Sequence, residues 1–187
     1  EKRRNKIIVF ANQKGGCGKT TNCVLSAGQF VLKHHCRLVV LDGDPQRSIV
    51  KKHEQDRERW PQLPPLYQVV PCTQLSSEKE TLNLIRAMRN EDFDFFIDTP
   101  GSLTQEGYLP LLFEADATVT TIQLEKTCIN GTTSFVDMVA MVARENGLDK
   151  LPPFYFLPNQ FNKNWGRKDE LVEQQKFLDY FAKLGTV

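Results

Sequence analysis

The chain has 187 residues, of which 40% are apolar and 25% are charged, and its formal net charge is +1. This length suits one domain with a sizeable core, and the near-neutral charge gives no global case for a nucleic-acid-binding domain. No apolar run approaches the roughly 20 residues of a membrane-spanning helix, and no signal-peptide core follows the charged start, so we expect a cytoplasmic protein.

The first chemical element is a glycine-rich loop between a predicted strand over residues 6–10 and a predicted helix over residues 20–33. A loop in this context is typical of phosphate binding, because its glycines let successive N–H groups point at phosphate oxygens beside a helix N-terminus. Lys19 is expected to reach the β- and γ-phosphates, and the Thr20 hydroxyl offers a magnesium ligand. The full set of expected phosphate-binding residues is Gly15, Gly16, Cys17, Gly18, Lys19, Thr20 and Thr21.

The loop departs from the common G-x-x-x-x-G-K-[ST] pattern, because Gln13 occupies the place of the first glycine and Lys14 precedes the glycine pair. The form K-G-G-x-G-K-T resembles the deviant Walker A box of the ParA/MinD family of ATPases. Asn-Gln before the loop and Thr-Thr after it are most similar to the ParA branch. The resemblance implies a P-loop NTPase fold, ATP and Mg²⁺ as cofactors, and an ATP-dependent homodimer. It also implies that Lys14 acts in catalysis by contacting phosphates bound to the partner subunit; a solvated loop lysine is the alternative.

Two acids follow the second predicted strand, over residues 37–41. Asp42 and Asp44 at the carboxyl end of a buried strand are costly unless a cation or water network meets them. The resemblance implies that Asp44 positions the attacking water and that Asp42 joins the outer magnesium shell. The alternative is that both acids cap a turn before Pro45.

A third acid closes another apolar strand, predicted over residues 93–98. Asp98 there is typical of the Walker B position, which holds magnesium through water. The sequence Asp98-Thr99-Pro100-Gly101 resembles the family's switch II. This resemblance implies that the Gly101 amide senses the γ-phosphate and that residues 105–112 move on hydrolysis. Between the second strand and this one lie a predicted strand over residues 67–70 and a helix that begins with the capping box Ser77-Glu78-Lys79-Glu80.

The C-terminal half continues the alternation of strands and helices. Residues 117–122 are predicted to form a strand, and Asn130-Gly131 to open a helix that ends at Gly147. The apolar stripe of that helix is predicted to bury Phe135, Val139, Val142, Met138 and Met141. A strand over residues 153–157 and a helix over residues 168–184, with Gly185 as its C-cap, complete the pattern.

Two features after the last predicted strand bear on nucleotide choice. The resemblance implies that Asn159, at the strand end, contacts the adenine amine. Asn162-Lys163-Asn164-Trp165 is superficially similar to a guanine clamp but has Trp165 in place of the acid that would accept hydrogen bonds from guanine. ATP is therefore favoured over GTP.

Together these elements predict an α/β fold with a mostly parallel twisted sheet and helices on both faces, in a single ATPase domain over residues 1–187. The resemblance implies a further strand and helix after Val187, so the expected domain is truncated at its C-terminus. The predicted function is Mg-dependent ATP hydrolysis that drives a dimerisation switch in DNA or plasmid partitioning or positioning. An ATPase-stimulating partner protein and non-specific DNA are the expected partners, and a membrane surface is less favoured.

Two alternatives stay open, and a third is disfavoured. A MinD-like or cellulose-synthesis accessory ATPase at the membrane would carry an amphipathic C-terminal helix, which would lie beyond Val187. A small-molecule kinase or synthetase on the same fold would not need Lys14. An iron–sulfur carrier needs cysteines just after a switch, and neither Cys72 nor Cys128 is placed there. The five cysteines are widely spaced, with no C-x-x-C pair, which favours reduced thiols.

Overall fold

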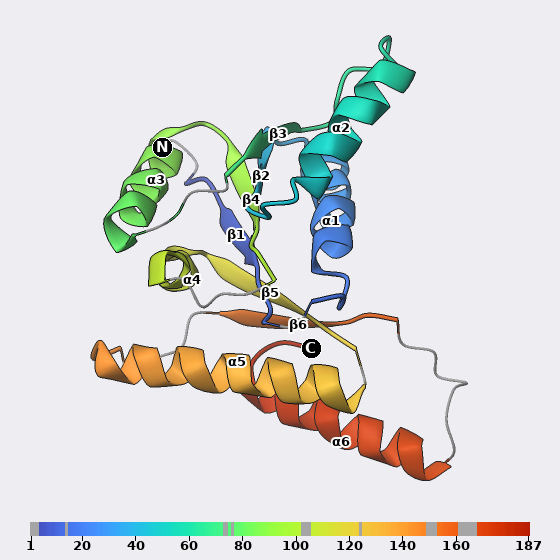
Figure 1. Cartoon of the computed structure of the whole chain (residues 1–187), viewed down its shortest axis with the longest axis vertical. Coiled ribbons are helices and arrows are strands. Elements are labelled where there is room, and N and C mark those ends of the chain that lie inside the picture. Colours follow the sequence, from blue (N-terminus) through green and yellow to red (C-terminus); the bar gives the residue numbers. More distant parts are fainter. Residues whose placement is uncertain are drawn as a thin grey trace.

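Six parallel strands form one sheet in the computed structural model, which describes residues 4–13, 15–72, 75, 77–101, 106–123, 125–148, 153–160 and 168–187, without the side chains of 168–170 and 173. The strand order is β3-β2-β4-β1-β5-β6, and every pair of neighbours is parallel. The strands are β1 (Ile7–Phe10), β2 (Leu38–Asp42), β3 (Gln68–Pro71), β4 (Asp94–Asp98), β5 (Ala117–Ile122) and β6 (Phe154–Pro158). The predicted α/β architecture is confirmed (Figure 1).

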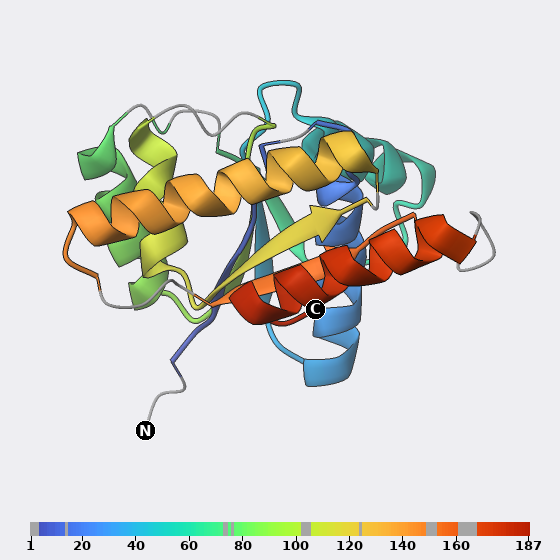
Figure 2. The ribbon, with the colours of Figure 1, turned by 90° about the horizontal axis from the view of Figure 1, so that it is seen from below.

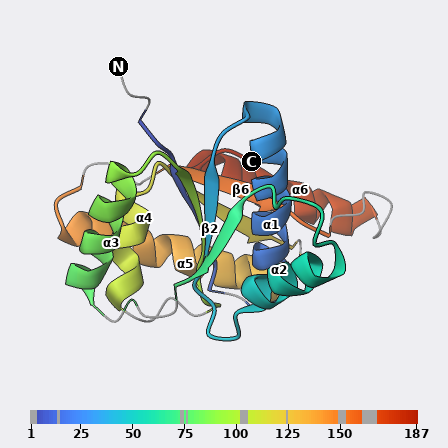
Figure 3. The ribbon, with the colours of Figure 1, turned by 90° about the horizontal axis from the view of Figure 1, so that it is seen from above.

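Helices cover both faces of the sheet (Figures 1 and 3). One face carries α1 (Lys19–His34) and α2 (Ser48–Arg59). The other carries α3 (Glu78–Asn90), a short 3₁₀ turn (Glu106–Tyr108), α4 (Leu109–Glu114), α5 (Lys126–Glu145) and α6 (Lys168–Leu184). Figure 2 shows α5 and α6 lying across β5 and β6.

The crossover connections from two neighbouring strands in the middle of the sheet, β1 and β4, run in opposite directions along the sheet. From β1 the chain crosses over α1 toward β2, whereas from β4 it crosses over α4 in the opposite direction, toward β5. Right-handed crossovers place these two helices on opposite faces. The carboxyl ends of β1 and β4 therefore flank the crevice in which such sheets bind ligands.

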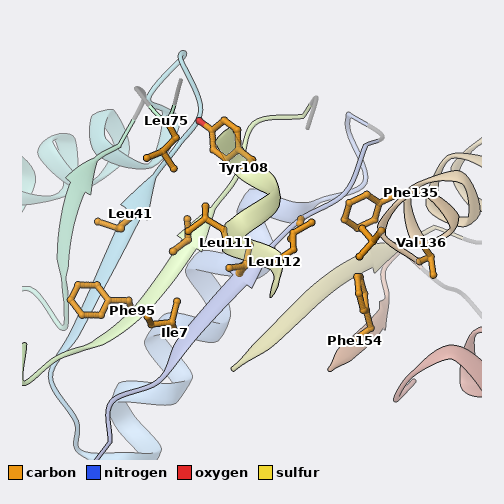
Figure 4. Close-up of a cluster of buried hydrophobic side chains, with 14 of the residues drawn as sticks. Ile7, Leu41, Leu75, Phe95, Tyr108, Leu111, Leu112, Phe135, Val136 and Phe154 are labelled. Atoms are coloured by element: carbon orange, nitrogen blue, oxygen red, sulfur yellow. The ribbon is translucent and has the colours of Figure 1, made fainter. Parts of the chain in front are cut away.

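Two apolar clusters fill the space between the sheet and its helices. The larger joins side chains of α3, α4, α5 and α6 to the sheet face beneath them, and Figure 4 shows Leu111 and Leu112 of α4 facing the strands that carry Ile7 and Phe95. The smaller lies under α1 and α2 and contains Phe10, Phe96 and Cys23. β1, β2 and β4 read as nearly continuous apolar runs because parallel strands are buried on both faces.

The structure corrects two predictions in the C-terminal half. α5 begins at Lys126, four residues before the predicted Asn130-Gly131 opening. Met141 is 53% exposed and does not belong to the core, while Met138 and Val142 are half-buried. Gly185 follows the last residue of α6, as predicted, and its N–H bonds to the Phe181 carbonyl; it is not in the left-handed region, and glycine is required there because a Cβ would overlap the Phe154 carbonyl.

Other local predictions are confirmed. The Ser77 hydroxyl accepts a hydrogen bond from the Glu80 amide at 3.3 Å, which is one half of the capping box at the start of α3. Gly147 has a φ of 69° and follows the end of α5, as predicted. After α6 the chain returns beside β6, where Tyr155 and Thr186 form a parallel bridge.

Candidate functional site

The glycine-rich loop runs from the end of β1 into the first turn of α1, as predicted. Gly16 and Gly18 have φ angles of 81° and 83°, in the left-handed region that glycine adopts without strain. A side chain at Gly18 would also overlap the Asn159 amide, whereas Gly15 and Gly16 border open space. The loop thus presents its backbone outward at the N-terminus of a 16-residue helix, which is the arrangement that binds anions.

Lys19 and Thr20 both contact the carboxylate of Asp98. The Lys19 ammonium lies 2.8 Å from Asp98 Oδ1 and also donates to the Thr99 carbonyl, and the Thr20 hydroxyl donates to Asp98 Oδ2 at 2.7 Å. Lys19 is only 7% exposed and Asp98 is fully buried. The predicted convergence of the loop with the end of β4 is therefore present as direct contacts.

Burial raises the pKa of Asp98, and the nearby Asp42 carboxylate adds to this shift. The charge of Lys19 and the hydrogen bonds from Lys19 and Thr20 act in the opposite direction and offset part of it. Asp98 is thus a carboxylate whose charge depends on the cation beside it.

Asp42 is fully buried at the end of β2, and three backbone amides hold it. Its Oδ1 accepts from the Asp44 amide at 3.2 Å, and its Oδ2 accepts from Ile49 and Val50 in the first turn of α2 at 3.0 and 3.1 Å. Arg47, the N-cap residue of α2, makes no side-chain cap, so Asp42 satisfies amides that would otherwise lack partners. These contacts support the capping interpretation of Asp42, and its place in a magnesium shell stays a prediction.

Asp44 is half-buried, and one of its oxygens accepts a hydrogen bond from the Gln46 amide at 2.8 Å. This contact is an Asx turn of the kind expected before a helix. The preceding Gly43 lies against β4: its amide donates to the Asp98 carbonyl at 2.8 Å, and a Cβ on Gly43 would approach that carbonyl to 2.7 Å. Only glycine fits there, so Gly43 fixes the distance between the two acid-bearing strand ends.

Gly101 lies next to the phosphate loop, because a Cβ built on Gly101 would come within 3.9 Å of the Gly15 Cα atom. The Thr99 hydroxyl and amide both donate to the Phe10 carbonyl, at 2.9 and 3.1 Å, and tie the segment after β4 to the end of β1. This placement suits the predicted sensing role of the Gly101 amide, although no contact tests that role.

Two amide side chains brace the loop from β5 and β6. Asn159 donates to the Cys17 carbonyl at 2.9 Å, and Gln123 donates to the Gly16 carbonyl at 3.1 Å. Asn159 was predicted at this end of the sheet as an adenine contact, but in the structure its amide is engaged with the loop backbone. Gln123 and Gly43 were not predicted as site residues, and Thr99 was named only as part of the switch II motif. All three lie within two residues of the end of a predicted strand.

Several predicted residues lie outside the described part of the chain: Lys14, Gln105 and the segment 162–165. Among the described residues, no group of three or more His, Cys, Asp or Glu side chains could hold a metal ion. This finding is compatible with magnesium, which is commonly bound through one or two carboxylates together with substrate phosphates and water. Thr20, Asp98 and the open side of the loop fit that pattern.

A model of the CobQ/CobB/MinD/ParA nucleotide-binding domain matches residues 8–184 of the chain. Among curated proteins, the maintenance of carboxysome distribution protein A of Halothiobacillus neapolitanus is 30% identical over 143 residues, covering 74% of this chain and 60% of that protein. The chain spans between 47% and 64% of the length of the curated relatives it matches.

Solved structures share the fold. A plasmid partition protein from Borrelia burgdorferi, bound to AMPPNP, aligns with a TM-score of 0.64 at 18% identity over 97% of this chain and 99% of that chain. A cobyrinic acid a,c-diamide synthase from Mycobacterium smegmatis, with bound ADP and magnesium, aligns with a TM-score of 0.64 at 22% identity, covering 96% and 82%. At these identities the likeness concerns the fold.

Proposed function

The chain belongs to the CobQ/CobB/MinD/ParA nucleotide-binding family, and we propose that it is a Mg-dependent ATPase that works as an ATP-driven dimerisation switch of the ParA type. The observation that carries this proposal is the meeting of Lys19, Thr20 and Asp98 at the end of β4, directly under an outward-facing phosphate loop. A partition protein with AMPPNP on the same fold and a 30%-identical positioning relative favour the ParA branch.

The residues present fit ATP and magnesium. Bound Mg-ATP would supply the phosphoryl group to be transferred and a cation to offset its charge. The amides of residues 15–21 and the Lys19 ammonium would bind the phosphates, the Thr20 hydroxyl would offer oxygen to the metal, and Asp98 would hold it through water. Gly15 and Gly16 have no atoms crowding their outer side, so the loop leaves room for this ligand.

On nucleotide binding, Asp98 would exchange Lys19 for a metal ion as its cationic partner. Lys19 now neutralises Asp98 at 2.8 Å, and a lysine that turns to phosphate leaves this buried carboxylate in need of another cation. Magnesium at Thr20 and Asp98 would meet that need. ATP binding should therefore depend strongly on magnesium.

Catalysis of ATP hydrolysis at this site would rest mainly on electrostatic stabilisation of the transition state. Lys19, the loop amides and, by resemblance, Lys14 from a partner subunit would stabilise charge on the phosphoryl oxygens. Asp44, half-buried at the end of β2, would orient the attacking water. No residue needs to form a covalent bond with the substrate.

The switch would run through the segment after Asp98. Gly101 borders Gly15, and the chain leads from Gly101 to α4. A conformational change at the phosphate loop could therefore be passed to α4. We include an ATP-dependent homodimer, an ATPase-stimulating partner protein and non-specific DNA in the proposal, on the strength of the ParA resemblance.

The small-molecule synthetase is the second candidate, because the cobyrinic acid a,c-diamide synthase shares this fold and its structure contains ADP and magnesium. Among the described residues, no helix has the length and hydropathy to cross a membrane.

Titration calorimetry with ATP and magnesium tests the proposal. Wild type should bind Mg-ATP, and Lys19→Ala should bind at least ~100-fold more weakly because the ammonium group that would pair with the phosphates is lost. Lys33→Ala, an exposed lysine at the other end of α1, is the matched control and should bind as wild type does. Circular dichroism must show that Lys19→Ala is folded. Equal affinity of Lys19→Ala and Lys33→Ala would contradict the site.

A further inference from the structure

Two cysteines far apart in the sequence meet behind the phosphate loop. The sulfur atoms of Cys17 and Cys128 lie 2.8 Å apart, and the two residues are only 1% and 0% exposed. Neither residue forms a disulfide in the structure. Because a disulfide has a sulfur–sulfur distance of about 2.05 Å, the two sulfurs would need to approach by only about 0.8 Å to be joined.

Each cysteine lies at the N-terminal end of a long helix. Cys17 directly precedes Gly18, the N-cap of α1, and Cys128 is in the first turn of α5. The backbone N–H of Gln123 also donates to the Cys128 sulfur at 3.4 Å. Helix N-termini favour negative charge, and the thiolate is the form of cysteine that reacts with oxidants. The two thiols thus combine direct contact with each other and positions at helix N-termini.

The other three cysteines lack this combination. Burial raises the pKa of Cys23 well above its usual value and also raises that of Cys72, which keeps both thiols protonated. Cys36 is half-exposed and follows the C-terminal end of α1, where the helix dipole disfavours an anion. The paired arrangement is thus specific to Cys17 and Cys128.

We propose that Cys17 and Cys128 are an oxidation site, at which a peroxide forms an intramolecular disulfide that pins the phosphate loop to α5 and weakens nucleotide binding. One thiolate attacks the peroxide O–O bond and becomes a sulfenic acid, releasing hydroxide from hydrogen peroxide. The second thiolate attacks that sulfur, forming the S–S bond and releasing the oxygen as water after protonation. Two thiols and one hydrogen peroxide give one disulfide and two waters.

A peroxide is small enough to reach a buried pair through local opening of the loop. Gly15 and Gly16 are exposed and have open space on their outer side, and short loops of this kind open more easily than core strands. Bulky disulfide reagents should react more slowly than hydrogen peroxide for the same reason.

The effect on ligand binding follows from where Cys17 is attached, and it rests on the proposed ATP site. The Cys17 carbonyl accepts a hydrogen bond from Asn159, and the neighbouring Gly16 and Gly18 have the left-handed backbone conformations of the loop. Binding constellations need positions accurate to about 0.5 Å, so a pull of several tenths of an ångström on Cys17 should misplace the amides of the loop. We expect the affinity for ATP to fall at least ~10-fold on oxidation.

Peptide mapping tests the disulfide directly. The reduced full chain is treated with hydrogen peroxide, free thiols are blocked, and a tryptic digest is analysed by mass spectrometry without reductant. The prediction is one linked pair, residues 15–19 with residues 127–144, that reducing agent separates. Recovery of both peptides as blocked thiols, or of Cys17 only as a sulfinic acid, would overturn the proposal.

Binding of a fluorescent ATP analogue, measured on the same samples, tests the consequence. Oxidised wild type should lose at least ~10-fold in affinity and regain it with dithiothreitol, as should Cys36→Ser, whereas Cys128→Ser should keep its affinity under peroxide. A mapped disulfide without change in affinity, or equal loss in Cys128→Ser, would overturn the gating. Failure of reduced wild type to bind the analogue would instead contradict the proposed ATP site, and the peptide map would still decide the disulfide.

Discussion

Asp98 accepts hydrogen bonds from both Lys19 and Thr20, the two side chains expected to hold the phosphates and the metal. This shared carboxylate explains how a buried lysine is tolerated, because a buried charge is stable only when it is paired. It also means that the site stores an internal ion pair that a nucleotide must replace.

At the same scale, Asp44 is expected to act on the rate of hydrolysis and not on binding. Asp44→Ala should bind ATP with near wild-type affinity but hydrolyse it at least ~100-fold more slowly, because in the proposed mechanism Asp44 orients the water and touches no phosphate. Single-turnover hydrolysis and equilibrium binding measure the two separately. Asp92→Ala removes an acid whose side chain is 73% exposed and is the control. Wild-type turnover by Asp44→Ala would show that another residue positions the water.

The residues that carry chemistry could largely be predicted from sequence, because they follow apolar strands whose ends must share one edge. Lys19, Thr20 and Asp98 meet as expected. The bracing contacts of Gln123 and Asn159 with loop carbonyls could not be predicted, because they depend on which strands lie side by side. The direct contact of Cys17 with Cys128 depends on the same strand order.

At the scale of elements, the start of α5 shows where local signals fail. Asn130-Gly131 is a strong turn signal, but the helix runs through it from Lys126, and Cys128 and Ile129 in its first turn are buried. Burial of this first turn outweighs the roughly 1 kcal/mol cost of a glycine inside a helix. Met141 was predicted to lie on the buried face of α5, but it is exposed. The apolar residues of this helix spread over a wide arc, so the sequence does not define the edge of the buried face.

A charged junction ties β1, α3 and the start of β5 together at the amino end of the sheet. Asp116 accepts from Arg89 at 2.7 Å and from the Ile7 amide at 2.8 Å. Burial alone would raise the pKa of Asp116, but the Ile7 amide and Arg89 outweigh it and hold this pKa below its usual value. A carboxylate with a lowered folded-state pKa stabilises the fold above its unfolded pKa and loses that contribution as the pH falls through the folded value.

Asp116→Asn should therefore lower the free energy of unfolding by about 2 kcal/mol at neutral pH, the value of hydrogen bonds to a charged group. The difference from wild type should shrink as the pH falls below about 4, toward and through the folded pKa. Denaturant unfolding at a series of pH values from about 3 to about 7, a range that crosses the ordinary pKa of carboxyl groups, measures the free energy of unfolding of both proteins. A constant difference across that range would contradict the assigned ion pair.

At the scale of the whole molecule, the alternation of strands and helices predicted a parallel sheet with two covered faces, and this is confirmed. The strand order was not predictable from local pattern, since it depends on which crossovers skip a strand. The reversal between β1 and β4 follows from that order, and it places the phosphate loop and Asp98 at the same crevice. The layout of the site is thus a property of the fold, while its chemistry is a property of a few residues.

The central claim is that ATP binding and self-association are linked, with Lys14 reaching across a two-fold interface to the nucleotide of the partner subunit. Linkage requires that ATP strengthens the dimer as much as the dimer strengthens ATP binding. Lys14→Ala should therefore bind ATP as a monomer yet fail to associate, because its contact exists only in the dimer.

Sedimentation velocity with a slowly hydrolysed ATP analogue and magnesium tests this most directly. Wild type and Lys33→Ala should shift from monomer toward dimer when the analogue is added, and Lys14→Ala should remain a monomer while retaining the bound analogue. Dimerisation of Lys14→Ala to the same extent as wild type would contradict the trans-acting lysine and would favour a small-molecule kinase or synthetase on this fold.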